Sequence, residues 1–204
     1  MQPSDPPFHL TNKYKMFLEQ TYTTDELIKR CRARERKAQE LLYKQYASKM
    51  LGVCMRYAND KMEAEDMLQN GFIKVFQKID DYRGDGSFEG WIRRIMVHSS
   101  IEYYRKHNKM MQLVELDEAG AESSTNPLAT AKLEAADLLV LIKNLAPGYR
   151  IIFNLYAIEG YSHKEIAEIA GITEGASKSQ LSRARSVLRE QIIKMEGKKY
   201  GYAG

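Results

Sequence analysis

The stretch SHKEIAEIAGITEGASKSQLSRARSVL (Ser162–Leu188) contains the clearest fold signal in the chain. Ser162 and Glu165 have the spacing of a capping box, in which both side chains accept hydrogen bonds from unpaired N–H groups at a helix start. The short helix ends at Gly171, a residue that can take a positive φ at a tight corner. A second helix then begins after Thr173. Two helices joined by such a turn predict a helix-turn-helix, which is typical of DNA-binding proteins.

The second helix of this motif has an apolar face and a basic, polar face. The apolar positions, at helical spacing, are Leu181, Ala184, Leu188 and Ile192. The polar positions offer short donors and cations, which suit base edges and phosphates in a major groove. An ordinary helical hairpin is the alternative, and the basic charges disfavour it. We expect DNA contacts from this motif at Ser162, Ser177, Lys178, Ser179, Gln180, Arg183 and Arg185.

The rest of the sequence predicts an all-α protein. A second capping box, Thr23 and Glu26, starts a helix, and another from about residue 62 to 79 has one apolar face. Glycines break the pattern in YRGDGSF (Tyr82–Phe88), so a loop is predicted there, followed by a helix over Phe88–His107. Helical patterns return from about residue 133. Strand signals are nearly absent.

An acidic segment without periodicity, Gln112 to Thr130, separates two basic parts of the chain. We therefore expect two small helical domains joined by a flexible acidic linker, the C-terminal one a helix-turn-helix. The expected division is a tail over 1–22, a domain over 23–110, the linker over 111–132, a domain over 133–196 and a tail over 197–204. Two basic domains suggest that the protein contacts a polyanion at two places. Two basic surfaces that only face solvent would give the same charge pattern.

Composition excludes several classes of protein. The 204 residues carry a formal net charge of +4, and the longest aliphatic run, Leu138–Ile142, is far too short to cross a membrane. The two cysteines and four scattered histidines form no disulfide framework and show no metal-ligand spacing. We also find no paired carboxylates or phosphate-binding glycine loop of an enzyme. A cytoplasmic protein with no catalytic residue, no metal and no cofactor is expected.

The predicted helix over Phe88–His107 interleaves cations with aromatic residues. Arg94, His98 and Arg105 share one face at helical spacing. Cationic side chains can pair with the phosphates along a strand, and aromatic rings can stack on its unpaired bases. This pattern therefore suits binding of single-stranded nucleic acid. For Trp91, a place in the core is the favoured interpretation. The expected nucleic-acid contacts from the pattern alone are Arg93, Arg94, Tyr104, Arg105 and Lys106.

Two sets of motifs together resemble a known family. Asp66-x-x-Gln69-x-x-Phe72-x-x-Val75, the Tyr82–Phe88 loop, Trp91-Ile-Arg-Arg-Ile95 and Tyr104-Arg-Lys106 resemble the first conserved domain of extracytoplasmic-function RNA polymerase sigma factors. The segment Gly175–Arg185 is similar to the recognition helix of the family's second domain, in the form of the Bacteroidetes-type branch. The resemblance covers about residues 24–109 and 135–195.

The resemblance implies a promoter-specificity subunit of RNA polymerase. It implies that the first domain docks on the β′ clamp helices of core polymerase, with the β subunit as a further contact. The further partners that it implies are promoter DNA, as duplex and as the melted non-template strand, and an inhibitory anti-sigma factor. Such an anti-sigma factor can be membrane-bound, but no insertion of this chain into the membrane is expected. The positions that match the polymerase-docking motif are Asp66, Gln69, Asn70 and Lys74.

The resemblance also implies how the two domains divide the promoter. The first domain melts the minus-ten element and captures a flipped base, and the second contacts the minus-thirty-five element. The chain departs from the family at His98, where asparagine is usual, and at Ala176 and Ser177, so base preference is not carried over. The positions that match the capture motif are Arg83, Asp85, Ser87, Phe88, Arg94 and His98.

Two other classes of protein stay open at this point. A DNA-processing enzyme such as a recombinase would share the helix-turn-helix and would cleave DNA. A helix-turn-helix regulator that acts without core polymerase would bind duplex operators tightly as a dimer and would form no stable complex with the polymerase.

Overall fold

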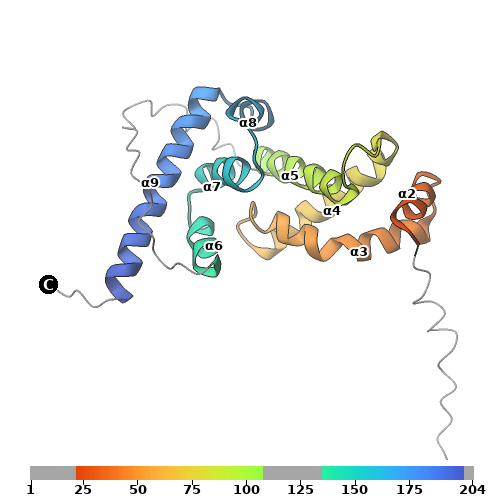
Figure 1. The fold of residues 1–204 in the computed structure, drawn as a ribbon, viewed down its shortest axis with the longest axis horizontal. Coiled ribbons are helices and arrows are strands. Elements are labelled where there is room, and N and C mark those ends of the chain that lie inside the picture. The colour runs from red at the N-terminus through yellow and green to blue at the C-terminus, as the bar shows by residue number, and fades with distance from the viewer. Residues whose placement is uncertain (1–21, 108–134, 200–204) are drawn as a thin grey trace, which may run out of the picture.

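The computed structural model describes residues 22–107 and 135–199, which are helical with short connections (Figure 1). Within these residues there is no strand, so the all-α prediction is confirmed there. The predicted linker over 111–132 lies outside the described residues. The described elements are α2 (Thr24–Arg32), α3 (Arg36–Cys54), α4 (Lys61–Lys78), the 3₁₀ turn η1 (Ile79–Asp81), α5 (Phe88–His107), α6 (Ala135–Lys143), α7 (Pro147–Phe153), the π-helical turn η3 (Asn154–Ile158), α8 (His163–Ala170) and α9 (Glu174–Lys199).

The N-terminal helical unit, residues 22–107, begins with the predicted capping box. The Glu26 N–H donates to Thr23 Oγ1 at 3.3 Å, and the Thr23 N–H donates to Glu26 Oε2 at 3.0 Å. These bonds satisfy N–H groups that a helix start otherwise leaves unpaired. The inward side of α2 buries Leu27, Ile28 and Cys31. The first helix of the unit is therefore fixed both by its cap and by burial.

Helices α4 and α5 approach each other closely at Gly71. A Cβ atom at Gly71 would lie 2.2 Å from Met96 Sδ, so a larger residue there would force the Met96 side chain of α5 to move. The predicted apolar face of α4, which includes Phe72 and Val75, is buried as expected. The opposite face of α4 is thereby held outward, and it includes the exposed Asp66 and Gln69.

The C-terminal helical unit, residues 135–199, contains the predicted helix-turn-helix in α8 and α9. The Ser162–Glu165 capping box opens α8, and Gly171 closes it with a φ of +71°. Leu141, Ile142 and Leu188 form part of a core in which α6 and α7 pack on α9. Helix α9 extends to Lys199, beyond the expected domain end at 196. None of the described helices is both long enough and apolar enough to span a bilayer.

The two helical units also contact each other, a feature for which the sequence pattern contains no signal. One buried cluster joins residues of the N-terminal unit, such as Tyr57, with Ile151, Ile152 and Leu155 of α7 and η3. Helix α8 packs against α5, so the C-terminal unit lies beside the end of α5 in Figure 1. The packing of the two units brings the loop before α8 onto the cationic face of α5.

Candidate nucleic-acid interface

The glycine loop between η1 and α5 is a compact turn with exposed polar side chains. Gly84 and Gly86 have φ values of +86° and +101°, which residues with a Cβ rarely adopt. The Tyr82 hydroxyl donates to the Gly86 carbonyl at 2.7 Å and closes the loop. Arg83, Asp85 and Ser87 are exposed on this loop, and the Ser87 hydroxyl accepts a hydrogen bond from the Gly90 N–H at 3.1 Å.

Two aromatic residues that were expected to contact DNA lie in the core instead. Phe88 is 4% exposed and packs against Tyr82 and Trp91, with ring centroids 5.0 and 5.6 Å away. Tyr104 is also buried, on the inward side of α5. The predicted DNA contacts of Phe88 and Tyr104 are therefore corrected, because their helical positions point them inward. Trp91 packs partly into the core, as favoured.

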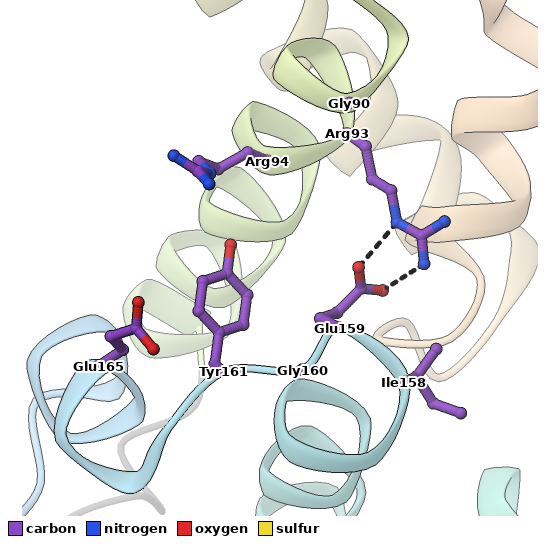
Figure 2. Close-up of a pocket in the computed structure, with 8 residues that line it drawn as sticks. All are labelled: Gly90, Arg93, Arg94, Ile158, Glu159, Gly160, Tyr161 and Glu165. Atoms are coloured by element: carbon purple, nitrogen blue, oxygen red, sulfur yellow. Dashed lines mark hydrogen bonds and ion pairs between the residues drawn. The ribbon is translucent and has the colours of Figure 1, made fainter. Parts of the chain in front are cut away.

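The cations of α5 face the C-terminal unit. Arg93 donates to both carboxylate oxygens of Glu159, at 2.7 and 3.0 Å. Arg94 is exposed beside Tyr161 (Figure 2). His98, also exposed and four residues further along α5, has its Nε2 atom 3.5 Å from the Tyr161 hydroxyl. Partial burial and the nearby positive charge of Arg94 lower the pKa of His98, so its ring is mostly neutral at neutral pH.

The last turn of α5 adds two further cations, Arg105 and Lys106. The Arg105 guanidinium lies against Gly171, 3.0 Å from where a Cβ would stand. Lys106 forms an i,i+4 ion pair with Glu102 at 3.1 Å. Both side chains are exposed, so the structure leaves them on the surface that was expected to contact nucleic acid.

The expected polymerase-docking residues gather on the outer face of α4. Asp66, Gln69 and Asn70 are exposed, and the Asn70 amide donates to the Asp66 carbonyl at 2.9 Å. Lys74 instead points towards α5, where its ammonium pairs with Glu102. The first three residues therefore form one polar patch, and Lys74 is tied to the neighbouring helix.

Two residues of the second motif helix that were expected to contact base edges are buried. Ser177 is 0% exposed, and its Oγ lies 2.9 Å from His163 Nδ1. Gln180 is 3% exposed, and its Oε1 has no hydrogen-bond partner in the described part of the chain. The predicted base contacts of Ser177 and Gln180 are therefore corrected. The outward or half-buried positions that remain are Lys178, Ser179, Arg183 and Arg185.

An aromatic pair, Tyr156 and His163, lies beside these cations and was not among the predicted site residues. The ring of Tyr156 stacks on His163 with centroids 4.7 Å apart, and the Arg185 guanidinium lies 5.6 Å from the Tyr156 centroid. Tyr156 belongs to η3 and His163 to the start of α8, so helical spacing gave no signal for the pair. Ser162 is exposed there, although its hydroxyl already bonds to Glu165.

Family models match both units in chain order. The model described as Sigma-70 region 2 matches residues 42–110, and the model described as Sigma-70, region 4 matches residues 135–188. The chain belongs to the sigma-70 family. Region 2 thus includes α4, the glycine loop and α5, and region 4 includes the helix-turn-helix.

Curated relatives assign the chain to the extracytoplasmic-function (ECF) group of this family. It is 30% identical over 158 residues to ECF RNA polymerase sigma factor SigE of Mycolicibacterium smegmatis, covering 75% of this chain but only 61% of that protein. It is 26% identical to the ECF RNA polymerase sigma-E factor of Haemophilus influenzae, covering 83% of this chain and 95% of that protein. A solved sigma factor RpoE from Bartonella quintana, in complex with the anti-sigma factor NepR, aligns with a TM-score of 0.47 at 23% identity, covering 76% of this chain and 96% of that one.

The burial of Gln180 gives the first testable prediction for region 4. Gln180→Leu should leave affinity for a short duplex unchanged and keep or raise stability, because it removes a buried amide oxygen without a partner. Lys178→Ala should weaken duplex binding. It should also make the plot of log K against log salt concentration less steep by about one, as expected when one phosphate interaction is removed. Fluorescence anisotropy at several salt concentrations measures both. A larger fall in affinity in Gln180→Leu than in Lys178→Ala would show that Gln180 contacts DNA after all.

Proposed function

We propose that this chain is an alternative sigma factor, which binds core RNA polymerase and directs promoter-specific initiation of transcription. The observation that supports this most is the presence of regions 2 and 4 in order, each with an exposed basic surface. A protein of this kind works in the cytoplasm, where polymerase and DNA are found. It acts through binding and contributes no catalytic group.

The two domains, 23–110 and 133–196, divide the promoter between them. The first melts and contacts the minus-ten element, with the glycine loop and the exposed Arg94 and His98 on the displaced non-template strand. The second contacts the duplex minus-thirty-five element through the start of α9, where Lys178 and Arg185 are exposed. The linker over 111–132 joins them.

Core polymerase binds the polar patch on α4. Asp66, Gln69 and Asn70 are exposed together, opposite a buried apolar face that fixes the helix in place. The β′ clamp helices are the proposed partner of this patch, and the β subunit is a further contact. An anti-sigma factor is the proposed inhibitor of the complex.

Copurification with core polymerase tests this proposal. The wild-type chain should form a stable complex, and Asp66→Ala with Gln69→Ala should weaken it about fivefold, the factor that about 1 kcal/mol represents. The matched control is Glu40→Ala with Gln45→Ala, which removes one acid and one glutamine from the exposed side of α3. A wild-type chain that binds duplex DNA but never core polymerase would instead identify a regulator that acts alone.

A further inference from the structure

Helix α2 ends in a tight corner that carries two arginines, Arg32 and Arg34. The corner is a Schellman motif, in which the Glu35 N–H donates to the Arg30 carbonyl at 3.1 Å and the Arg34 N–H donates to the Cys31 carbonyl at 3.0 Å. The residue at the position of Arg34 must take a positive φ, and glycine is the usual choice. Arg34 has a φ of +61°, and no other non-glycine residue of the described chain has a positive φ. The corner therefore has an arginine where glycine would fit the backbone with less strain.

The side chain of Arg34 makes contacts that a glycine could not make. Its Nη1 donates to the Phe76 carbonyl, and its Nη2 donates to Asp80 Oδ2 at 3.0 Å. Phe76 lies in the last turn of α4, where carbonyl groups lack partners within the helix and a nearby cation is favourable. The strained corner of α2 thus brings a cation to the end of α4.

Arg32 extends this contact from α4 to the glycine loop. Its Nε donates to the Ile79 carbonyl at 3.3 Å, and its Nη2 donates to the Tyr82 carbonyl. Ile79 is the buried first residue of η1, and Tyr82 begins the loop. Helix α2 packs against η1, next to the loop in Figure 1. Because the donors of a guanidinium have a fixed geometry, one side chain holds these two carbonyl groups in a defined relation.

The bonds within the glycine loop do not attach it to another element. The Tyr82 hydroxyl donates to the Gly86 carbonyl, and the Gly86 N–H donates to the Gly84 carbonyl at 2.9 Å. Both bonds close the loop on itself. The bond from Arg32 connects the start of the loop to α2, so it helps to set the direction in which the exposed Arg83 leaves the helices.

We infer that Arg32 and Arg34 are positioning residues for strand capture by the glycine loop. They hold the end of α4 and the start of the loop, so that the loop is in place before the melted strand arrives. A loop that occupies the binding position only part of the time would bind with an affinity reduced by that fraction. The inference rests on the proposed function of the loop. Both arginines precede residues 42–110, which the region 2 model matches, so the match itself assigns them no role.

Trp91, the single tryptophan of the chain, reports on the position of the loop. Its ring stacks on Phe88, and its centroid lies 5.5 Å from that of Tyr82. Quenching of its fluorescence by acrylamide should increase in Arg34→Gly and in Arg32→Gln, because each variant frees the start of the loop. The matched control is Arg36→Gln, which removes the same charge from the exposed start of α3 and should leave quenching unchanged. Wild-type quenching in both loop variants would overturn the inference, whatever the function of the chain.

Arg34→Gly separates positioning from stability. Glycine relieves the backbone strain at this φ while the side-chain bonds are lost, so the midpoint of urea unfolding should change little. In reconstituted polymerase, permanganate footprinting should show an open bubble reduced about three- to tenfold in Arg34→Gly and in Arg32→Gln, with core binding retained. Arg34→Lys keeps a cation at this position and should recover part of the opening. Normal opening in both Arg34→Gly and Arg32→Gln would contradict the inference.

A double variant tests whether Arg34 acts through the loop. Arg83→Ala removes an exposed cation of the loop and should reduce opening in the wild-type background. Combined with Arg34→Gly, it should cause a smaller further loss, because a displaced loop no longer makes the contact that Arg83 provides. Losses that multiply fully would show that the two residues act independently and would refute positioning. A wild-type chain that never binds core polymerase would refute the proposed function instead, and Trp91 quenching would still decide whether the arginines hold the loop.

Discussion

Leu42→Ala is expected to lower the free energy of unfolding by about 2–5 kcal/mol. Leu42 is 0% exposed in α3, within the core on which α4 and α5 pack. Truncation loses the transfer free energy of the buried methyl groups and leaves a cavity that neighbours fill only in part. Because the chain has one tryptophan, Trp91 on α5, urea unfolding followed by its fluorescence reports on this unit.

Ile73→Ala is the matched control for this prediction. Ile73 is a branched aliphatic residue on the neighbouring α4, but it is 54% exposed. Its truncation should change the unfolding free energy by about 0.5 kcal/mol or less, as for most surface substitutions. Similar losses in the two variants would mean that Leu42 is not part of a tightly packed core.

Arg94→Ala with His98→Ala is expected to reduce promoter opening about tenfold or more. Both side chains are exposed on the face of α5 proposed to hold the melted strand. Removing one interaction with a base or phosphate from such a surface costs on the order of 1–3 kcal/mol. Permanganate footprinting of unpaired thymines measures the open bubble, using reconstituted polymerase on a promoter that it transcribes.

The control for the opening defect removes the same positive charge elsewhere. Arg36→Ala with Gln45→Ala changes two exposed positions of α3 and removes one positive charge outside α5. This control should retain the open bubble, and both double variants should retain binding to core polymerase. An unaffected footprint in Arg94→Ala with His98→Ala would place the melting surface elsewhere on region 2.

Local chemistry made several elements of this fold predictable. The capping boxes at Thr23 and Ser162 form as their spacing indicated, and Gly171 takes the expected positive φ. Helix α5 has the predicted bounds, because the glycine loop before it cannot continue a helix. Each of these signals depends on residues within one turn of each other, which is the range over which a sequence pattern is informative.

The direction of single side chains was harder to predict where a polar residue continues an apolar face. Ser177 lies four residues before Leu181 and seven before Ala184, so helical periodicity turns it inward with them. Gln180 precedes Ala184 by four. Their polar character suggested DNA contacts, and their positions in the helix decided otherwise. The DNA contact of Phe88 was instead implied by the resemblance, and Phe88 precedes the buried Ile92 by four residues, so helical periodicity turns it inward too.

The contact between the two units had no local signal at all. Glu159 lies 66 residues from Arg93 and 103 residues from Arg56 along the chain. An acidic residue between a helix and a turn is ordinary by itself, and only tertiary packing brings it to these arginines. Cations that look like free DNA-binding groups in the sequence can therefore be occupied in the folded molecule.

The π-helical turn at Asn154–Ile158 makes the contact between the units depend on chain register. The Glu159 N–H donates to the Asn154 carbonyl at 2.9 Å, a spacing that accommodates one residue more than an α-helical turn does. Since each helical residue rotates the chain by about 100°, a one-codon deletion in this turn would swing Glu159 away from Arg93. During evolution, insertion or deletion of one residue in this turn would therefore break or restore the Glu159 ion pairs, although Glu159, Arg93 and Arg56 themselves stayed unchanged.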